Sequence, residues 1–283
     1  MKTETHVVRP GLQPIPGVKN IIAIASGKGG VGKSTTAVNL ALALQAEGAT
    51  AAILDADIYG PSQAQMLGVT TKPESDGKSL KPIISHGIQS MSIAYLLPEN
   101  DTPMIWRGPM VSTTLQQLLN DTRWEDVDYL IIDLPPGTGD IQLTLSQKIP
   151  VTAAVIVTTP QDIALLDARK ALQMFNKVKI PVLGIIENMS VHVCSECGHQ
   201  EHIFGEGGGE SMAEQYGVEL IGSLPLDKSI REQTDTGKPS VVAEPDGAIA
   251  MSYRSIARTL HEKTSKLAKS YASKFPKIVI EQA

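Results

Sequence analysis

A glycine-rich segment directly follows an apolar run near the start of the chain, and its residue types suit phosphate binding. It reads Gly27-Lys28-Gly29-Gly30-Val31-Gly32-Lys33-Ser34 and fits the pattern G-x-x-x-x-G-K-[ST]. Glycine lets backbone N–H groups wrap closely around phosphate oxygens because it has no Cβ. Lys33 would reach the β- and γ-phosphates, and the Ser34 hydroxyl would bind Mg²⁺. The segment therefore predicts a site for a nucleoside triphosphate.

Polar residues also follow other apolar runs that we interpret as strands, and ligands of an open parallel sheet bind at such strand ends. Asp133 follows the run at 129–132 and could hold Mg²⁺ through its water shell, while Gly137 could offer a backbone N–H to the γ-phosphate. A simple strand-ending turn is the alternative. Asn188 follows the run at 182–186, and its amide could pair with an adenine edge or merely form a turn.

Two carboxylates, Asp55 and Asp57, follow the apolar run at 51–54. Alternate side chains of an extended chain point to opposite sides, so at most one of the two faces the γ-phosphate. We expect Asp57, which lies farther out, to orient the attacking water. Asp55 would then support the loop or the outer shell of the metal.

The two cysteines of the chain, Cys194 and Cys197, form a C-x₂-C pair. In a reducing compartment such a pair is metal-binding or redox-active rather than a structural disulfide. A redox pair would need a helix start, whereas Gly198 and the His- and Glu-rich sequence after it indicate a loop. His199 and His202 could complete a zinc site in one chain, but they are crowded against the thiolates. Two thiolates from each of two chains would suit either zinc or an iron–sulfur cluster.

Composition limits the class of protein. Apolar residues make up 42% of the 283 residues, and no apolar run approaches the roughly 20 residues that span a bilayer. The first six residues lack the apolar core of a secretory signal, so we expect a cytoplasmic protein without a membrane partner. A net charge of −5 and an aromatic content of 4% argue against nucleic-acid binding.

The elements that must position these residues follow from the apolar runs. Strands buried on both faces of a parallel sheet are expected at residues 20–25, 51–54, 129–132, 153–157 and 182–186. The intervening sequence has helical periodicity, which predicts an α/β fold: a doubly wound, mostly parallel sheet with helices on both faces.

Two helices and the domain limits complete this interpretation. One helix is expected at 161–178, from the apolar series Ile163, Leu165, Leu166, Leu172 and Phe175. A closing helix with Lys and Arg on one face is expected at 248–273. We assign residues 20–275 to one nucleotide-binding domain with a metal loop at 190–203, and residues 1–19 and 276–283 to extended tails.

The motifs together resemble a known family. Lys28 to Thr35 is similar to the deviant Walker A loop of the MinD/ParA/nitrogenase-iron-protein group of dimeric ATPases. With the segments 55–62, 133–140, 187–190 and 194–198, it resembles the Mrp/ApbC family of iron–sulfur cluster carrier ATPases over about residues 18–260. Many bacterial members have a small additional N-terminal domain, whereas here we expect only a tail.

The resemblance implies roles for individual residues. Residues 27–35 would bind ATP, and Lys28 would reach across a homodimer interface to the partner's nucleotide, as an arginine finger does. Asp57 would take part in ATP hydrolysis, and Asn188 would contact the adenine base of the nucleotide. Cys194 and Cys197 of two subunits would hold a labile [4Fe–4S] cluster, received from cluster assembly machinery and passed to apo iron–sulfur proteins.

Two other functions fit parts of the sequence. A MinD- or ParA-like spatial regulator could carry a structural zinc at the cysteine pair, but it would need a basic DNA-binding face or an amphipathic membrane tail, and neither is evident. An electron-donating reductase like the nitrogenase iron protein also bridges a cluster across a dimer. Its cluster cysteines are widely separated in sequence, unlike Cys194 and Cys197.

Overall fold

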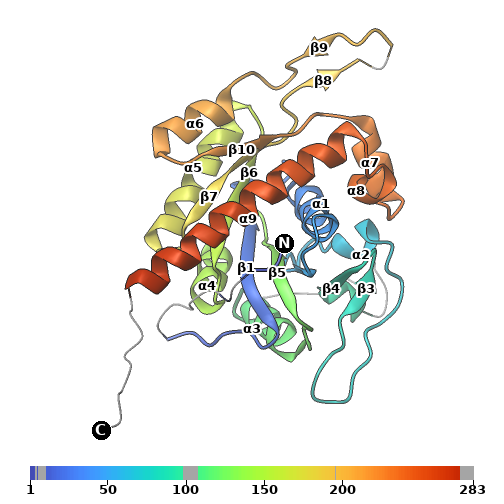
Figure 1. Ribbon diagram of the computed structural model, residues 1–283, viewed down its shortest axis with the longest axis vertical. Helices are drawn as coiled ribbons and strands as arrows, with labels where there is room; N and C mark the ends of the chain where they lie inside the picture. Colours follow the sequence, from blue (N-terminus) through green and yellow to red (C-terminus); the bar gives the residue numbers. More distant parts are fainter. Residues whose placement is uncertain (4, 6–10, 98–107, 195, 275–283) are drawn as a thin grey trace.

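The computed structural model describes residues 1–3, 5, 11–97, 108–194 and 196–274, which form a sheet between two layers of helices (Figure 1). Within these residues, eight strands make up the sheet in the order β10-β7-β6-β1-β5-β2-β4-β3. All neighbours are parallel except β3 and β4. The strands are β1 (Val18–Ala25), β2 (Ala51–Asp55), β3 (Ile83–Ser85), β4 (Ile88–Ser92), β5 (Val127–Asp133), β6 (Ala153–Thr158), β7 (Val182–Glu187) and β10 (Leu220–Ser223).

Helices connect these strands, and a short hairpin projects from one end of the molecule (Figure 1). The hairpin pairs β8 (His192–Val193) with β9 (Gln200–Glu201) in antiparallel fashion. The helices are α1 (Lys33–Ala46), α2 (Gln63–Met66), η1 (Ile93–Tyr95), α3 (Gly108–Asp121), α4 (Asp140–Lys148), α5 (Asp162–Lys177), α6 (Gly208–Tyr216), α7 (Lys228–Asp235), α8 (Ser240–Ala243) and α9 (Ala248–Lys274).

Both faces of the sheet are buried, which explains why its central strands are continuously apolar. Ile22 and Ile24 of β1 belong to the core that includes α1 and α9, whereas Ala23 and Ala25 belong to the core that includes α3 to α6. Successive side chains of one strand thus enter opposite cores. The predicted doubly wound fold is confirmed.

Every strand expected from an apolar run is present, but the sequence did not predict β3, β4 and β10 of the sheet, nor the short strands β8 and β9. The strand β4 is fully buried although Gln89, Ser90 and Ser92 interrupt its apolar residues. Each of these polar side chains has a partner: Gln89 Nε2 donates to Glu125 O, Ser90 Oγ to Ile83 O and Ser92 Oγ to Asp55 Oδ2. Because hydrogen bonds satisfy these groups, the strand is buried without an apolar run.

The helix expected at 161–178 is α5, and the closing helix expected at 248–273 is α9. In α5, Leu165, Leu172 and Phe175 are buried, as the apolar series requires. Ile163 and Leu166, however, are 71% and 52% exposed. They lie outside the core and form an apolar face of α5 toward solvent. Within the described ranges, no helix combines the length and the apolarity that crossing a bilayer demands.

The described part of the predicted N-terminal tail lies against the domain. The Met1 amino group donates to Glu47 O over 3.3 Å, and Asn20 Nδ2 donates to Thr3 Oγ1 over 3.3 Å. The first strand already begins at Val18, inside the range assigned to the tail. Residues 4 and 6–10 of that tail and the whole C-terminal tail at 276–283 lie outside the described residues.

Candidate functional site

The glycine-rich loop joins the carboxyl end of β1 to the first residue of α1, where the sequence places it. Gly32 caps α1 with a φ of +79°, a left-handed conformation that favours glycine. A Cβ at Gly32 would lie 2.2 Å from Asn188 Nδ2, and one at Gly27 would lie 2.2 Å from Asp167 O. The loop is therefore held between the end of β7 and α5, and neither position has room for a side chain.

A cavity of about 230 Å³ lies against the loop at the carboxyl edge of the sheet. Lys33, Ser34 and Thr35 line it from one side, and Asp57 and Ser62, from the segment after β2, line it from another. Strand ends of a parallel sheet are the usual ligand positions in this class of fold. The structure thus brings the loop and one of the predicted carboxylates together around one cavity.

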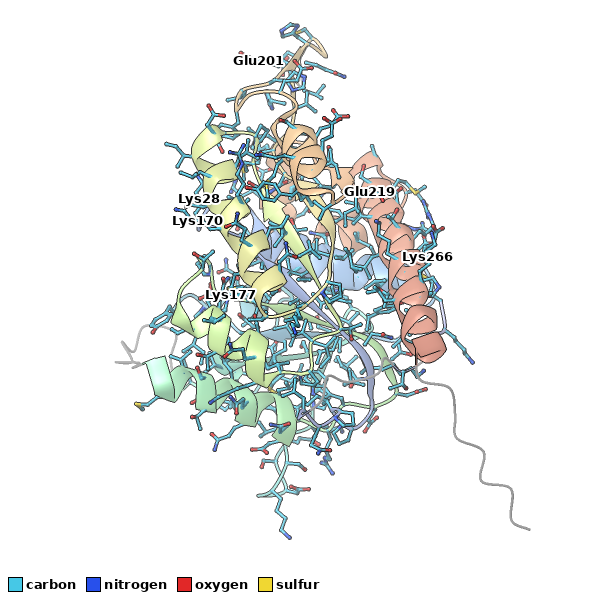
Figure 2. The ribbon with its side chains drawn as sticks, turned by 90° about the vertical axis from the view of Figure 1, so that its left-hand side faces the viewer. Lys28, Lys170, Lys177, Glu201, Glu219 and Lys266 are labelled. Carbon is cyan, nitrogen blue, oxygen red and sulfur yellow. The ribbon has the colours of Figure 1, made fainter. Side chains whose placement is uncertain are left out.

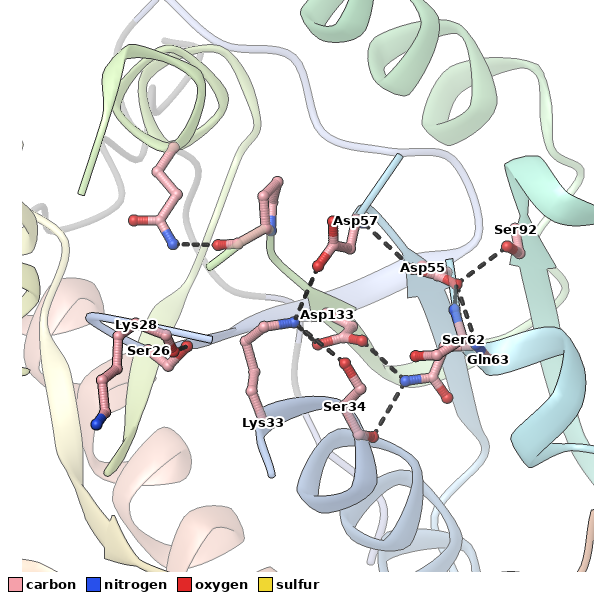
Figure 3. A network of polar contacts seen from close by, with 12 residues as sticks. Ser26, Lys28, Lys33, Ser34, Asp55, Asp57, Ser62, Gln63, Ser92 and Asp133 are labelled. Atoms are coloured by element: carbon pink, nitrogen blue, oxygen red, sulfur yellow. Dashed lines mark hydrogen bonds and ion pairs between the residues drawn. The ribbon is translucent and has the colours of Figure 1, made fainter. Parts of the chain in front are cut away.

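The Lys33 ammonium lies among the polar groups of this site (Figure 3). Its Nζ is 2.5 Å from Asp133 Oδ1, 3.2 Å from Ser34 Oγ and 4.0 Å from Asp57 Oδ2. Lys33 and Asp133 are both buried, so their opposite charges offset much of the cost of leaving water. Burial raises the pKa of the Asp57 carboxyl, and the nearby Lys33 charge opposes that rise only in part.

Asp55 supports the loop that carries Asp57, which agrees with the role expected for it. Its Oδ1 accepts the N–H of Asp57, and its Oδ2 accepts the N–H groups of Ser62 and Gln63 and the hydroxyl of Ser92. The side chain is completely buried. Burial, together with the Asp133 charge, raises the pKa of Asp55 to about 7.

Gln63 is a site residue that the sequence did not indicate. It is fully buried at the start of α2, and its Nε2 donates to Ser34 O over 3.1 Å and to Asp133 Oδ2 over 2.9 Å (Figure 3). No motif calls for glutamine at this position. The one sequence feature that could have indicated Gln63 is its position directly after the loop that begins at Asp55.

Gly137 and Asn188 both contact the loop region, although neither lines the cavity. The Gly137 N–H, which we expect at the γ-phosphate, donates here to Ser26 O over 3.0 Å. Asn188 Nδ2 donates to Val31 O over 2.9 Å and so fastens the end of β7 to the phosphate loop. The roles assigned to both residues toward the nucleotide remain predictions.

Lys28 differs from Lys33 in where its side chain points. Figure 3 shows it directed away from Lys33 and Asp133, and Figure 2 places it on the side of the molecule that presents α5. Within the described part of the chain, no carboxylate forms an ion pair with the Lys28 ammonium. Residue Lys28 also lines the cavity, and its role toward a second subunit remains a prediction.

Both cysteines lie on the hairpin that follows β7, and both are free thiols. Cys194 N donates to His199 O and Gly198 N donates to Cys194 O, so the segment turns back on itself. This is a loop, as expected, and not the helix start of a redox pair. Hydrogen bonds from the backbone N–H groups of Cys197 and Glu196 lower the pKa of the Cys194 thiol.

Two histidines of this segment, His192 and His202, contact backbone carbonyl groups. His202 Nδ1 contacts Ser190 O over 2.8 Å, and His192 Nδ1 contacts Leu226 O over 3.0 Å. Among the residues that the structure describes, no three His, Cys, Asp or Glu side chains converge on a possible metal position. The one-chain zinc site with His199 and His202 is therefore not formed among the described residues, and metal binding by the two thiols remains a prediction.

Comparison with known proteins agrees with these motifs. Residues 17–261 match the family model described as ParA, NUBPL iron-transfer P-loop NTPase. An iron–sulfur cluster carrier protein from Pseudomonas fragi is 62% identical over 90% of this chain and 89% of its own length. The iron–sulfur cluster transfer protein NUBPL of Mus musculus is 49% identical over 89% of this chain and 81% of its own length.

Solved structures share the fold. A nucleotide-binding protein from Archaeoglobus fulgidus, determined in complex with ADP, is 36% identical with a TM-score of 0.72, over 83% of this chain and 91% of that one. MinD from Pyrococcus horikoshii, complexed with Mg-ADP, is 22% identical with a TM-score of 0.63, over 88% of this chain and 99% of that one, and shows a likeness of fold alone. With its phosphate loop, cysteine pair and matched length, the chain belongs to the NUBPL iron-transfer P-loop NTPase family.

Proposed function

We propose that the protein is an ATP-hydrolysing carrier that holds a labile [4Fe–4S] cluster between two subunits and passes it to apo iron–sulfur proteins. The observation that carries this proposal is a pair of free thiols on a projecting hairpin, in a chain that also has a complete phosphate loop. The carrier and transfer activities named for the relatives support the identity of the cargo. Cluster assembly machinery would be the donor.

Two thiols per chain make a second subunit necessary. A [4Fe–4S] cluster normally takes four thiolate ligands, and the described residues bring no third metal ligand to the hairpin. Cys194 and Cys197 from each of two subunits would supply the four. The lowered pKa of Cys194 favours the thiolate, which is the form that binds iron. A recipient would take the cluster when its own thiolates replace those of the carrier on iron, with no change in oxidation state.

The residues around the cavity suit ATP with Mg²⁺. Ser62 Oγ in the cavity wall and Gln63 Oε1 beside it are buried oxygens without a hydrogen-bond partner among the described residues. Hydroxyl, carbonyl and carboxylate oxygens are the groups that Mg²⁺ and its bound waters prefer. Ser34 and Asp133 would hold the ion, whose charge would offset that of the phosphates.

Hydrolysis would use residues on both sides of the cavity. Lys33 would leave Asp133 for the β- and γ-phosphates, and Asp57, which lines the cavity, would orient the attacking water. The Gly137 N–H, which donates to Ser26 O in this structure, would donate to the γ-phosphate instead. Asn188 keeps its carbonyl oxygen and a second N–H for an adenine edge while it contacts Val31.

The face beside α5 suits the second subunit. Ile163 and Leu166 expose apolar surface there, and Lys28 points out on the same side of the molecule (Figure 2). A second copy would cover the apolar side chains and would offer its nucleotide to Lys28. Each subunit would in this way contribute a charge to the site of the other, which makes hydrolysis dependent on dimerisation.

Single substitutions in the hairpin test the carrier function. Cys194→Ala and Cys197→Ala should each lose the reconstituted cluster and the ability to activate a cluster-requiring apoenzyme, yet bind ATP as the unaltered protein does. His199→Ala, a change in the same hairpin at a residue that is not a proposed ligand, should keep both properties. Cysteine variants that still transfer a cluster at the unaltered rate would refute the proposal.

A further inference from the structure

Gln63 joins three parts of the nucleotide site that are far apart in the sequence. Its side chain reaches Ser34 O at the start of α1 and Asp133 Oδ2 at the end of β5. Its backbone N–H donates to Asp55 Oδ2, at the end of β2, over 3.1 Å. The side chain is completely buried, so these contacts are shielded from water.

The orientation of the Gln63 amide follows from its neighbours. Ser34 O is a carbonyl and Asp133 Oδ2 belongs to a carboxylate, and both groups accept hydrogen bonds. The nitrogen of the amide must therefore face them, which directs Oε1 the other way. Oε1 is buried without a partner among the described residues, so it remains free to accept a hydrogen bond.

Gln63 and Lys33 each contact a different oxygen of the Asp133 carboxylate. Lys33 Nζ contacts Oδ1 and Gln63 Nε2 contacts Oδ2. In the proposed reaction Lys33 turns to the phosphates, and the Gln63 amide then keeps Asp133 in its orientation. An uncharged donor is sufficient at this place, because Lys33 already supplies the positive charge that balances Asp133.

We propose that Gln63 is a positioning residue for the Mg²⁺ of ATP hydrolysis. Its Nε2 fixes the Asp133 carboxylate relative to Ser34, the two residues that we propose to hold the ion. Partners of this kind orient the ligands of a metal, and their loss typically lowers metal affinity or activity by 10- to 100-fold. The inference rests on the proposed ATP hydrolysis and adds a residue that acts through Asp133.

The test compares Gln63→Met with Gln65→Met. Methionine has a similar length but offers no amide, and Gln65 lies exposed on the same short helix. We expect Gln63→Met to raise the Mg²⁺ concentration for half-maximal ATPase activity by roughly tenfold or more. Its affinity for ADP in the presence of a chelator should stay within about twofold of the unaltered protein. Gln65→Met should change neither value.

Two further measurements keep the inference open to refutation. If Gln63→Met does not fold, Gln63→Asn takes its place in the test. Asparagine retains the amide but is too short to reach both acceptors, so this variant should raise the Mg²⁺ requirement as well. A lower melting temperature or turnover with an unaltered Mg²⁺ requirement would mean a purely structural role and would overturn the inference. Mn²⁺ affinity of the ADP complex tests Gln63 even if the unaltered protein proves unable to hydrolyse ATP, which would contradict only the proposed function.

Discussion

Lys33 Nζ and Asp133 Oδ1 lie 2.5 Å apart in a buried ion pair at the carboxyl edge of the sheet. The two residues come from the phosphate loop and from the end of β5, and Ser34 and Gln63 contact the same pair. An ammonium thus already balances the carboxylate that the proposed Mg²⁺ needs. Binding of Mg·ATP would replace this contact with one between Lys33 and phosphate, so the two loop lysines should differ sharply in their roles.

Lys33→Ala should weaken ATP binding by at least about tenfold, or ~1.4 kcal/mol, because it removes the charge that meets the β- and γ-phosphates. Lys28→Ala should bind ATP normally and lower turnover by roughly 10³-fold, because its charge would act across the dimer in the transition state. Equilibrium binding and steady-state ATPase assays separate the two effects. An equal loss of binding in both variants would exclude the role across the dimer.

Asp57→Asn should lower turnover by roughly 100-fold while Mg·ATP still binds, because an amide is a poorer acceptor for the attacking water. Asp133→Asn should instead weaken the dependence of ATP binding on Mg²⁺. Binding measured with and without a chelator, beside single-turnover rates, distinguishes these results. Normal turnover in Asp57→Asn would mean that another group orients the water.

Leu166→Glu should weaken the dimer, because it places a charge on the apolar face that α5 presents beside Lys28. Sedimentation of the ATP-bound protein should show a dissociation constant at least about tenfold higher and a matching loss of turnover at low protein concentration. Ile84→Glu alters another exposed apolar residue, on the edge strand β3, and serves as the control. If both variants dimerise like the unaltered protein, another face must form the dimer.

Glu47→Gln should destabilise the packing of α9 against α1 by about 1 kcal/mol at pH 7. Burial raises the pKa of Glu47, but the hydrogen bonds from Arg254 and Arg258 outweigh it and lower that pKa below its ordinary value. The stabilisation of the fold by the ionised Glu47 carboxylate is therefore present above about pH 4.5, and it is lost as the pH falls below that value.

Urea unfolding of the unaltered protein and of Glu47→Gln between pH 7 and pH 3 checks the direction of this pH dependence. The difference in unfolding free energy should shrink toward acid pH. Glu74→Gln, which alters an exposed carboxylate paired with Lys81, should have little effect at any pH. A Glu47→Gln difference that grows as the pH falls would contradict the account.

The sequence predicted the parts of the site that follow from local rules. A phosphate loop is contiguous in the chain, and Asp57 and Asp133 each follow an apolar strand, so their positions at one sheet edge could be inferred from parallel topology. Gln63 could not be found in this way. Its importance depends on a contact with Asp133, 70 residues later, and its residue type has no fixed place in any motif.

Other features depend on tertiary environment in the same way. The strand β4 is buried because partners from other elements satisfy Gln89, Ser90 and Ser92, which periodicity cannot reveal. The apolar series of α5 predicted a helix correctly, but it could not tell that Ile163 and Leu166 face away from the core. In one sequence, an apolar residue that faces solvent cannot be told apart from a residue of the core.

Iron and acid-labile sulfide analysis of protein purified under anaerobic conditions tests the central claim most directly. Each chain has two cysteines, and a [4Fe–4S] cluster normally takes four, so reconstituted protein should hold about one cluster per two chains and should activate a cluster-requiring apoenzyme. Protein that instead contains stoichiometric zinc, takes up neither iron nor sulfide, and leaves the apoenzyme inactive would contradict the carrier function.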